Sequence, residues 1–191
     1  SMRKFAILMP LALVLAVSGC GSNTPPGTVT TTTSGNWEAR LIGGTGPSSQ
    51  LNFVTTFTVT NTNGGSSELD IPGFSFFNSG PCFAVGTNTE NKSGSATITV
   101  QSNGQVTGNM TYSVTSVAAN GVTGGNNLTL TSQTNGFTGT FTGSSPTTGS
   151  ISNGVVVGTW TLDSSDPNCT GNATKTGTFV MCQGNTTCTP P

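Results

Sequence analysis

Apolar and polar residues alternate one by one along much of this chain. The alternation recurs in several stretches, including residues 95–101 and 105–117. In residues 50–60 one face carries Leu51, Phe53, Thr55, Phe57 and Val59. Successive side chains of a β-strand point to opposite faces, so this pattern predicts strands with one buried face. After residue 20 no stretch has the period of a helix, and the chain is therefore predicted to be all-β.

Asn-Gly pairs separate the alternating stretches. This dipeptide tolerates the positive φ angles of type I′ turns, so between alternating segments it indicates a β-hairpin. The pairs stand at 63–64, 103–104, 120–121, 135–136 and 153–154. Residues 95–182 are accordingly predicted to form an antiparallel meander. The domain as a whole is predicted to close as a barrel or sandwich of about eight to ten strands. The even spacing of the last four pairs would also fit a parallel β-solenoid, which does not need type I′ turns.

The first twenty residues have the form of a secretory signal. Arg3 and Lys4 precede an apolar run from Phe5 to Val17, which is too short for a spanning helix. The run ends in Val-Ser-Gly-Cys20, which resembles the lipobox of bacterial lipoproteins. The resemblance implies cleavage before Cys20, a diacylglyceryl group on its thiol and an acyl chain such as palmitate on the new amine. It also implies attachment to a membrane through this lipid.

Gly21 follows the cysteine, where an aspartate would resemble an inner-membrane retention signal, so the outer membrane is the predicted location. The chain is predicted to divide into a signal peptide (1–19), a lipidated flexible tether (20–35) and an all-β domain (36–191). The tether assignment rests on the low-complexity Thr, Ser, Pro and Gly composition of residues 21–35.

Charge is scarce in this chain. Charged residues make up 6% of it, against about 25% in typical globular proteins, and Thr, Ser, Asn and Gly supply the polarity instead. Without Arg3 and Lys4, three basic residues face six acidic ones, a balance of 3 − 6 = −3. This balance gives no electrostatic support for binding nucleic acid.

Four cysteines remain beyond Cys20, and an even number in an exported domain indicates disulfides. If residues 155–163 and 173–182 form a hairpin, Cys169 and Cys182 lie at opposite ends, roughly 25–30 Å apart at about 3.3 Å per residue. That separation excludes a bond between them. Cys182 and Cys188 enclose a short loop, which closes easily. The predicted pairs are therefore Cys182–Cys188 and Cys82–Cys169.

The sequence offers no recognisable reaction centre. Without histidine, a Ser-His-Asp or Cys-His arrangement is impossible. The carboxylates lie in no catalytic motif, and they are Glu38, Glu68, Asp70, Glu90, Asp163 and Asp166. Residues 163–168 could offer oxygen ligands to a weak Ca²⁺ ion but lack the features of an EF-hand, so a plain turn is predicted. We expect no catalytic activity, no cofactor and no metal site.

Two features leave alternatives open. An aromatic segment carries Phe74, Phe76, Phe77 and Phe83 among turn formers, and either plugs one end of the core or forms the mouth of a ligand cavity. Thr-x-Thr steps such as Thr97-Ile-Thr99 and Thr129-Leu-Thr131 are ordinarily solvent-facing residues of half-buried strands. The alternative is a flat hydroxyl face of the kind that binds ice or carbohydrate.

Gly35-Asn36-Trp37 opens the first long predicted strand and resembles the Gly-x-Trp signature of lipocalins and avidins, the calycin barrels. That resemblance implies an up-and-down barrel whose interior holds a small hydrophobic ligand. Because the first and last strands of a closed barrel pair, Trp37 and Trp160 are both predicted to be buried, with Trp37 plugging the closed end.

The chain also resembles a set of uncharacterised acidobacterial-type lipoproteins, which implies a β-barrel-like fold and no known activity. The matching residues are Cys20, Gly35-Asn36-Trp37, Pro81-Cys82-Phe83, Gly158-Thr159-Trp160 and Cys169.

The expected function is that of a lipid-anchored, non-catalytic protein of the cell envelope, which binds a small apolar ligand or a glycan. The alternative is a structural, assembly or adhesion subunit that associates, with itself or with others, through sheet edges. An internal cavity with a hydrophobic mouth would favour an apolar ligand, and a filled interior with a long unpaired edge strand would favour assembly.

Overall fold

The computed structural model describes only part of the chain. The described residues are 28–33, 36–43, 51–62, 66–78, 82–83, 90–116, 125–144, 148–164, 169, 175–184 and 188. The predicted signal peptide (1–19), Cys20 and the tether up to residue 27 lie outside them. Within this part of the chain, no helix is long and apolar enough to cross a membrane.

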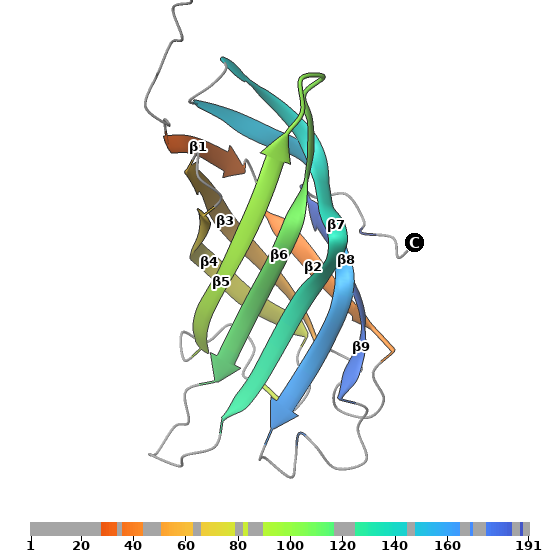
Figure 1. Ribbon diagram of the computed structural model, residues 1–191. Helices are drawn as coiled ribbons and strands as arrows, with labels where there is room; N and C mark the ends of the chain where they lie inside the picture. The colour runs from red at the N-terminus through yellow and green to blue at the C-terminus, as the bar shows by residue number, and fades with distance from the viewer. Residues whose placement is uncertain are drawn as a thin grey trace, which may run out of the picture.

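The protein is all-β, as predicted (Figure 1). The described residues form nine strands, and their bounds are β1 (Thr28–Thr33), β2 (Trp37–Ile42), β3 (Asn52–Thr62), β4 (Ser66–Asn78), β5 (Glu90–Val100), β6 (Gln105–Ser116), β7 (Asn126–Ser144), β8 (Thr148–Ser164) and β9 (Thr176–Gln183). Each strand from β2 to β9 pairs antiparallel with the next, and β9 pairs back with β2. The predicted meander therefore closes into a nearly complete barrel through its first and last strands.

Strand β1 corrects the prediction that residues 20–35 are entirely a flexible tether. β1 pairs antiparallel with β3 from Thr58 onward and parallel with β8 up to Ile151. The β2 ladder begins only at Thr55 of β3, and the β9 ladder ends at Val155 of β8, which leaves both edges open beyond these residues. Threonine is β-branched and favours extended backbone, so this Thr-rich segment readily forms a strand. β1 therefore lies between β3 and β8, where β2 and β9 no longer separate them.

Two of the Asn-Gly pairs do not form the predicted turns. Asn103-Gly104 does lie in the β5–β6 turn, with φ of 81° at Gly104. Asn135 and Asn153, with φ of 56° and 52°, lie instead inside β7 and β8, where the ladder between these strands shifts register. The positive φ that a tight turn requires also suits a β-bulge. The Asn-Gly pairs therefore predicted the backbone conformation correctly, but the predicted hairpin turns are wrong at these two positions. Pairs 63–64 and 120–121 lie outside the described residues.

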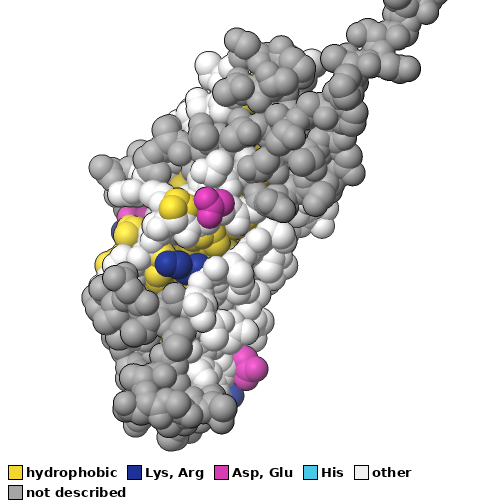
Figure 2. All heavy atoms as spheres, turned by 90° about the vertical axis from the view of Figure 1, so that its left-hand side faces the viewer, with side chains coloured by type: hydrophobic (Ala, Val, Ile, Leu, Met, Phe, Trp, Pro, Cys, Tyr) yellow, Lys and Arg dark blue, Asp and Glu magenta, His cyan; other side chains and the backbone are white. Residues whose placement is uncertain are grey.

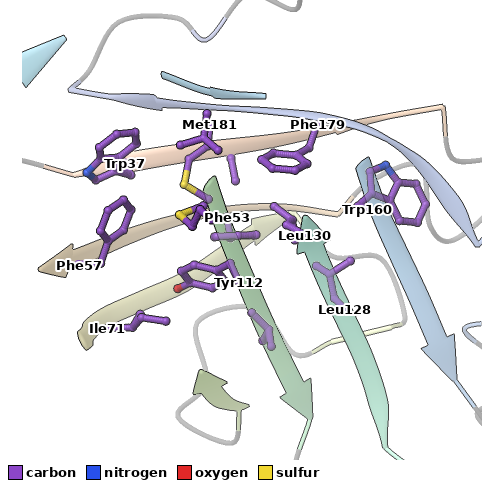
Figure 3. Packing of buried hydrophobic residues seen from close by; sticks show 14 of the residues in the cluster. Trp37, Phe53, Phe57, Ile71, Tyr112, Leu128, Leu130, Trp160, Phe179 and Met181 are labelled. Carbon is purple, nitrogen blue, oxygen red and sulfur yellow. The ribbon is translucent and has the colours of Figure 1, made fainter. Parts of the chain in front are cut away.

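The barrel axis is filled by side chains from every strand between β2 and β9 (Figure 3). Trp37 stacks on Phe57, with ring centroids 4.7 Å apart, and also contacts Phe137. Further along the axis, Phe53 contacts Tyr112. The Tyr112 hydroxyl lies 2.7 Å from Thr55 Oγ1, which donates to the carbonyl of Gly73 at 2.7 Å. Burial raises the pKa of Tyr112, so this phenol stays neutral and belongs to the core.

Both tryptophans are fully buried, as predicted, and each lies over a glycine. A Cβ atom at Gly154 would come within 2.2 Å of the Trp37 ring, and one at Gly177 within 2.5 Å of Trp160 Nε1. The two indoles differ in their hydrogen bonding. Trp160 Nε1 donates to the carbonyl of Ile42 at 3.0 Å, whereas Trp37 Nε1 is buried with no hydrogen-bond partner among the described residues.

The end of the barrel remote from β1 is tied together by covalent and polar contacts. Cys82 and Cys169 form a disulfide at this end, with Cα atoms 4.5 Å apart. The second disulfide, Cys182–Cys188, lies toward the β1 side instead, since Cys182 pairs with Val155 of β8 and Glu38 of β2. This pairing is the one predicted from the sequence. Buried Asn126 donates through Nδ2 to the Cys82 carbonyl, and the Ser164 hydroxyl donates to Asn126 Oδ1. These contacts join the segment after β4 to the first residue of β7, the last residue of β8 and the segment that follows β8.

Candidate functional site

The outer surface of strands β5 to β9 carries two rows of hydroxyl side chains. The ladders align Ser95, Thr111, Thr131, Thr159 and Thr178 in one row. The other row is Ser93, Ser113, Thr129, Thr161 and Thr176. We call these ten residues the hydroxyl face. Every step from one strand to the next is in register, so each row crosses five adjacent strands without interruption.

Strand geometry sets the spacing of this face. Neighbouring strands lie about 4.8 Å apart, so one row runs about 19 Å over its four intervals. The two rows are two residues apart along each strand, which is about 6.7 Å. Because the strands belong to a barrel, the face is convex rather than flat, and β5 to β8 lie side by side toward the viewer in Figure 1.

The hydroxyl groups of this face are available to an external partner. Most of the ten residues are exposed and the others are half-buried. Within the described part of the chain, one side-chain hydrogen bond joins members of the face, between Ser113 Oγ and Thr129 Oγ1 at 3.3 Å. Each remaining hydroxyl can donate one hydrogen bond and accept two.

Charged groups lie at two borders of the face: Glu68 of β4 pairs with Ser95 at one side, and others lie at the lower border. Asp163 lies two residues beyond Thr161 on β8 and pairs with Asn127 of β7. Lys175 directly precedes Thr176 of β9. Lys92 is next to Ser93 in the chain but occupies an inward-facing position, because its ladder partner Val114 is buried in the core. The face therefore presents a neutral surface of hydroxyl and methyl groups, which offers no electrostatic attraction to a strongly charged partner.

The aromatic segment mainly completes the core. Phe76 and Phe83 are buried and stack with ring centroids 4.6 Å apart, and Phe74 packs against them half-buried. Phe77 points outward and is 47% exposed. The structure thus brings together three of the four phenylalanines proposed as a ligand mouth. They plug the end of the barrel beside the Cys82–Cys169 bond, with the core side chains filling the axis above them.

The carboxylates are dispersed over the surface. Glu38 forms an ion pair with Arg40 on the outer side of β2, and Asp70 and Asp163 are exposed on different strands. Among the residues that the structure describes, no three potential ligands from His, Cys, Asp and Glu come together. Asp166 and Asn168, the remaining parts of the weak calcium motif, lie outside the described residues.

Sequence reasoning found the hydroxyl face only in part. Of the Thr-x-Thr steps identified in the sequence, Thr129-x-Thr131 contributes one threonine to each row. Thr97-x-Thr99 lies beyond both rows, toward the β5–β6 turn. Thr159-x-Thr161 and Thr176-x-Thr178 repeat the same spacing and could have been added from the sequence. Their alignment across strands was not predictable, because it depends on register.

Comparison of the chain with protein-family models, with curated proteins and with solved structures finds no match. The functional argument therefore rests on the site itself.

Proposed function

We propose that this protein is a lipid-anchored, non-catalytic module of the cell envelope that binds neutral glycans through the hydroxyl face. The observation that carries the proposal is the in-register alignment of ten Ser and Thr residues over five strands. A neutral polysaccharide presents hydroxyl donors and acceptors along its length and carries no charge, so its surface chemistry complements this face.

The expected binding mode is many weak contacts. A net hydrogen bond contributes about 0.5–1.5 kcal/mol, so a single sugar would be held weakly. A chain that lies along a row of about 19 Å engages several hydroxyls at once, and linked contacts raise the overall affinity. The proposal therefore names an extended glycan rather than a monosaccharide.

The position of the face suits an anchored protein. Both rows lie in the half of the barrel toward the Cys82–Cys169 bond, whereas β1 pairs at the opposite end, next to Thr62 and Thr148. The chain reaches β1 directly from the lipobox cysteine and the following residues. A lipid on Cys20 would then hold the β1 end near the membrane and leave the hydroxyl face turned away from it.

The filled axis favours this surface over an internal apolar ligand. Trp37, Phe53 and Trp160 are fully buried along the axis and contact other core side chains. The pairing of β2 with β9 also joins the two ends of the meander, which removes the free edges that assembly through those strands would use.

Affinity electrophoresis tests the proposal with native gels that contain dextran, mannan, galactan or hydroxyethyl cellulose. The wild-type protein should be retarded by at least one of these neutral polysaccharides. The triple variant Thr111→Val, Thr131→Val, Thr159→Val removes three hydroxyls of one row and keeps the β-branched shape. It should lose most of the retardation.

The matched control is Thr58→Val, an outward threonine on β3 that lies on another side of the barrel. It should migrate as the wild type does in every gel. Equal retardation of the triple variant and the wild type, or no retardation of the wild type by any of the four polymers, would falsify the proposed function.

A further inference from the structure

A third row of outward side chains borders the hydroxyl face on the side of the Cys82–Cys169 bond. The ladders align its members on β5 to β8, and they are Asn91, Thr115, Asn127 and Asp163. Each lies two residues along its strand from a member of the row that contains Thr161, so it points to the same side of the sheet. Amide and carboxylate groups therefore adjoin the hydroxyls of β7 and β8.

Hydrogen bonding leaves polar groups free where β7 and β8 meet. Thr115 Oγ1 donates to Asn127 Oδ1 at 3.2 Å, which leaves the two N–H donors of the Asn127 amide for another partner. Asp163 and Thr161 are both exposed. Within the described part of the chain, neither the Asp163 carboxylate nor the Thr161 hydroxyl has a side-chain partner. Donors and acceptors thus stand together on the outer surface.

Buried contacts fix the backbone behind these groups. Asn126 and Ser164, the chain neighbours of Asn127 and Asp163, are ladder partners on β7 and β8. The Ser164 hydroxyl donates to Asn126 Oδ1, and Asn126 Nδ2 donates to the carbonyl of disulfide-bonded Cys82. Asn127 and Asp163 therefore project from a part of the barrel that is held rigidly, and a rigid element positions binding groups precisely.

Strand geometry places the three free groups within the reach of one sugar ring. Asn127 and Asp163 are cross-strand partners, whose Cβ atoms lie about 4.5–5.5 Å apart. Thr161 is two residues from Asp163 on β8, which is about 6.7 Å. A vicinal diol, two hydroxyls on neighbouring carbon atoms, can donate from one oxygen to the Asp163 carboxylate and accept at the other from the Asn127 amide.

We infer that Asn127, Thr161 and Asp163 form the primary sugar subsite of the hydroxyl face, an inference that rests on the proposed function. The subsite selects glycans whose rings carry an unsubstituted vicinal diol. Hydrogen bonds to an ionised group are stronger than those between neutral groups, so this corner holds a sugar more tightly than the rows of hydroxyls do. The rows then hold the rest of the polymer.

Affinity electrophoresis with chemically altered polymers tests the selection of the diol. Dextran, mannan, galactan and hydroxyethyl cellulose are each used in native form and after periodate oxidation followed by borohydride reduction. Periodate cleaves the carbon–carbon bond of a vicinal diol, and borohydride reduces the two aldehydes to alcohols, so the polymer stays neutral but loses its diols. A native polymer that retards the wild type should retard it far less after this treatment.

Asp163→Asn tests the carboxylate with little change of shape. It should weaken binding to the native polymer about tenfold, because a hydrogen bond to a charged group is replaced by a neutral one. The matched control is Asp70→Asn, which removes the same charge from an exposed position on β4 and should bind as the wild type does. Figure 2 shows the side of the barrel that carries β4, where charged side chains lie among hydrophobic ones.

Two results would overturn the inference: equal retardation of Asp163→Asn and the wild type, or equal retardation by the native and the treated polymer. If the variant Thr111→Val, Thr131→Val, Thr159→Val still loses its retardation in that case, the proposed function stands without this subsite. A wild type that none of the four native polymers retards overturns both.

Discussion

The two buried tryptophans provide a matched pair for measuring what one hydrogen bond contributes to this barrel. Trp37 and Trp160 are both 0% exposed, and each covers a glycine of a neighbouring strand. Trp160 Nε1 donates to the Ile42 carbonyl at 3.0 Å, and Trp37 Nε1 is buried without a partner in the part of the chain that the structure describes. Replacement by phenylalanine therefore removes the same atoms in both cases, but it breaks a hydrogen bond only at Trp160.

The difference between the two variants can be estimated from these contacts. Both lose a similar packing contribution, because the same volume is removed from a filled core. Trp160→Phe also breaks a hydrogen bond and leaves the Ile42 carbonyl without that donor, at about 1–3 kcal/mol. Trp37→Phe instead removes an unsatisfied N–H, which regains about 1–3 kcal/mol. The two contributions add, so Trp160→Phe should lower the free energy of unfolding by about 2–6 kcal/mol more than Trp37→Phe.

Urea unfolding followed by far-ultraviolet circular dichroism, with the disulfides intact, measures the difference. The slope of the free energy with urea should be equal for the two variants, so that their midpoints compare the same transition. If Trp37→Phe is as destabilising as Trp160→Phe, or more so, the unpaired state of the Trp37 indole is not what sets its contribution, and the reasoning fails.

Two further predictions concern Asn126 and the two disulfides. Asn126→Ala removes two side-chain hydrogen bonds, those with Cys82 and Ser164, and should lower the free energy of unfolding by about 1–3 kcal/mol. A change well below about 1 kcal/mol in urea titration would contradict this. The disulfides should differ with their separation in sequence, 87 residues for Cys82–Cys169 and 6 for Cys182–Cys188. Loop-closure entropy then assigns about 4–5 and about 2 kcal/mol, respectively, so the double serine variant of the first pair should unfold at the lower urea concentration, and the opposite order would refute the estimate.

Several parts of the fold could be predicted from local sequence alone. Alternation between residues 50 and 60 identifies β3 because side chains on a strand repeat every two residues. The disulfide pairing followed from the reach of one hairpin, since strand length separates Cys169 from Cys182. Burial of Trp37 followed from barrel closure, which brings the first and last strands of the meander together.

Other parts were missed because one local signal serves two structures. A positive φ at Asn135 or Asn153 suits a turn and a bulge equally, and only pairing with the neighbouring strand distinguishes them. The threonines of β1 read as part of a tether, since their strand forms only where β3 and β8 leave an open gap. Asn126 gave no signal, because its partners Cys82 and Ser164 come from other segments.

The hydroxyl face shows where sequence and tertiary structure divide their roles. The sequence by itself determined that Thr129, Thr131, Thr159 and Thr161 point outward, because alternation assigns each side chain to a face. Only the tertiary structure decided that Thr131 lies beside Thr159 and Thr129 beside Thr161. A slip of two residues between strands would keep every threonine outside and every apolar residue inside, so alternation cannot select the register. Long-range packing, bulges and the closure of the barrel select it, and with it the surface on which the proposed function depends.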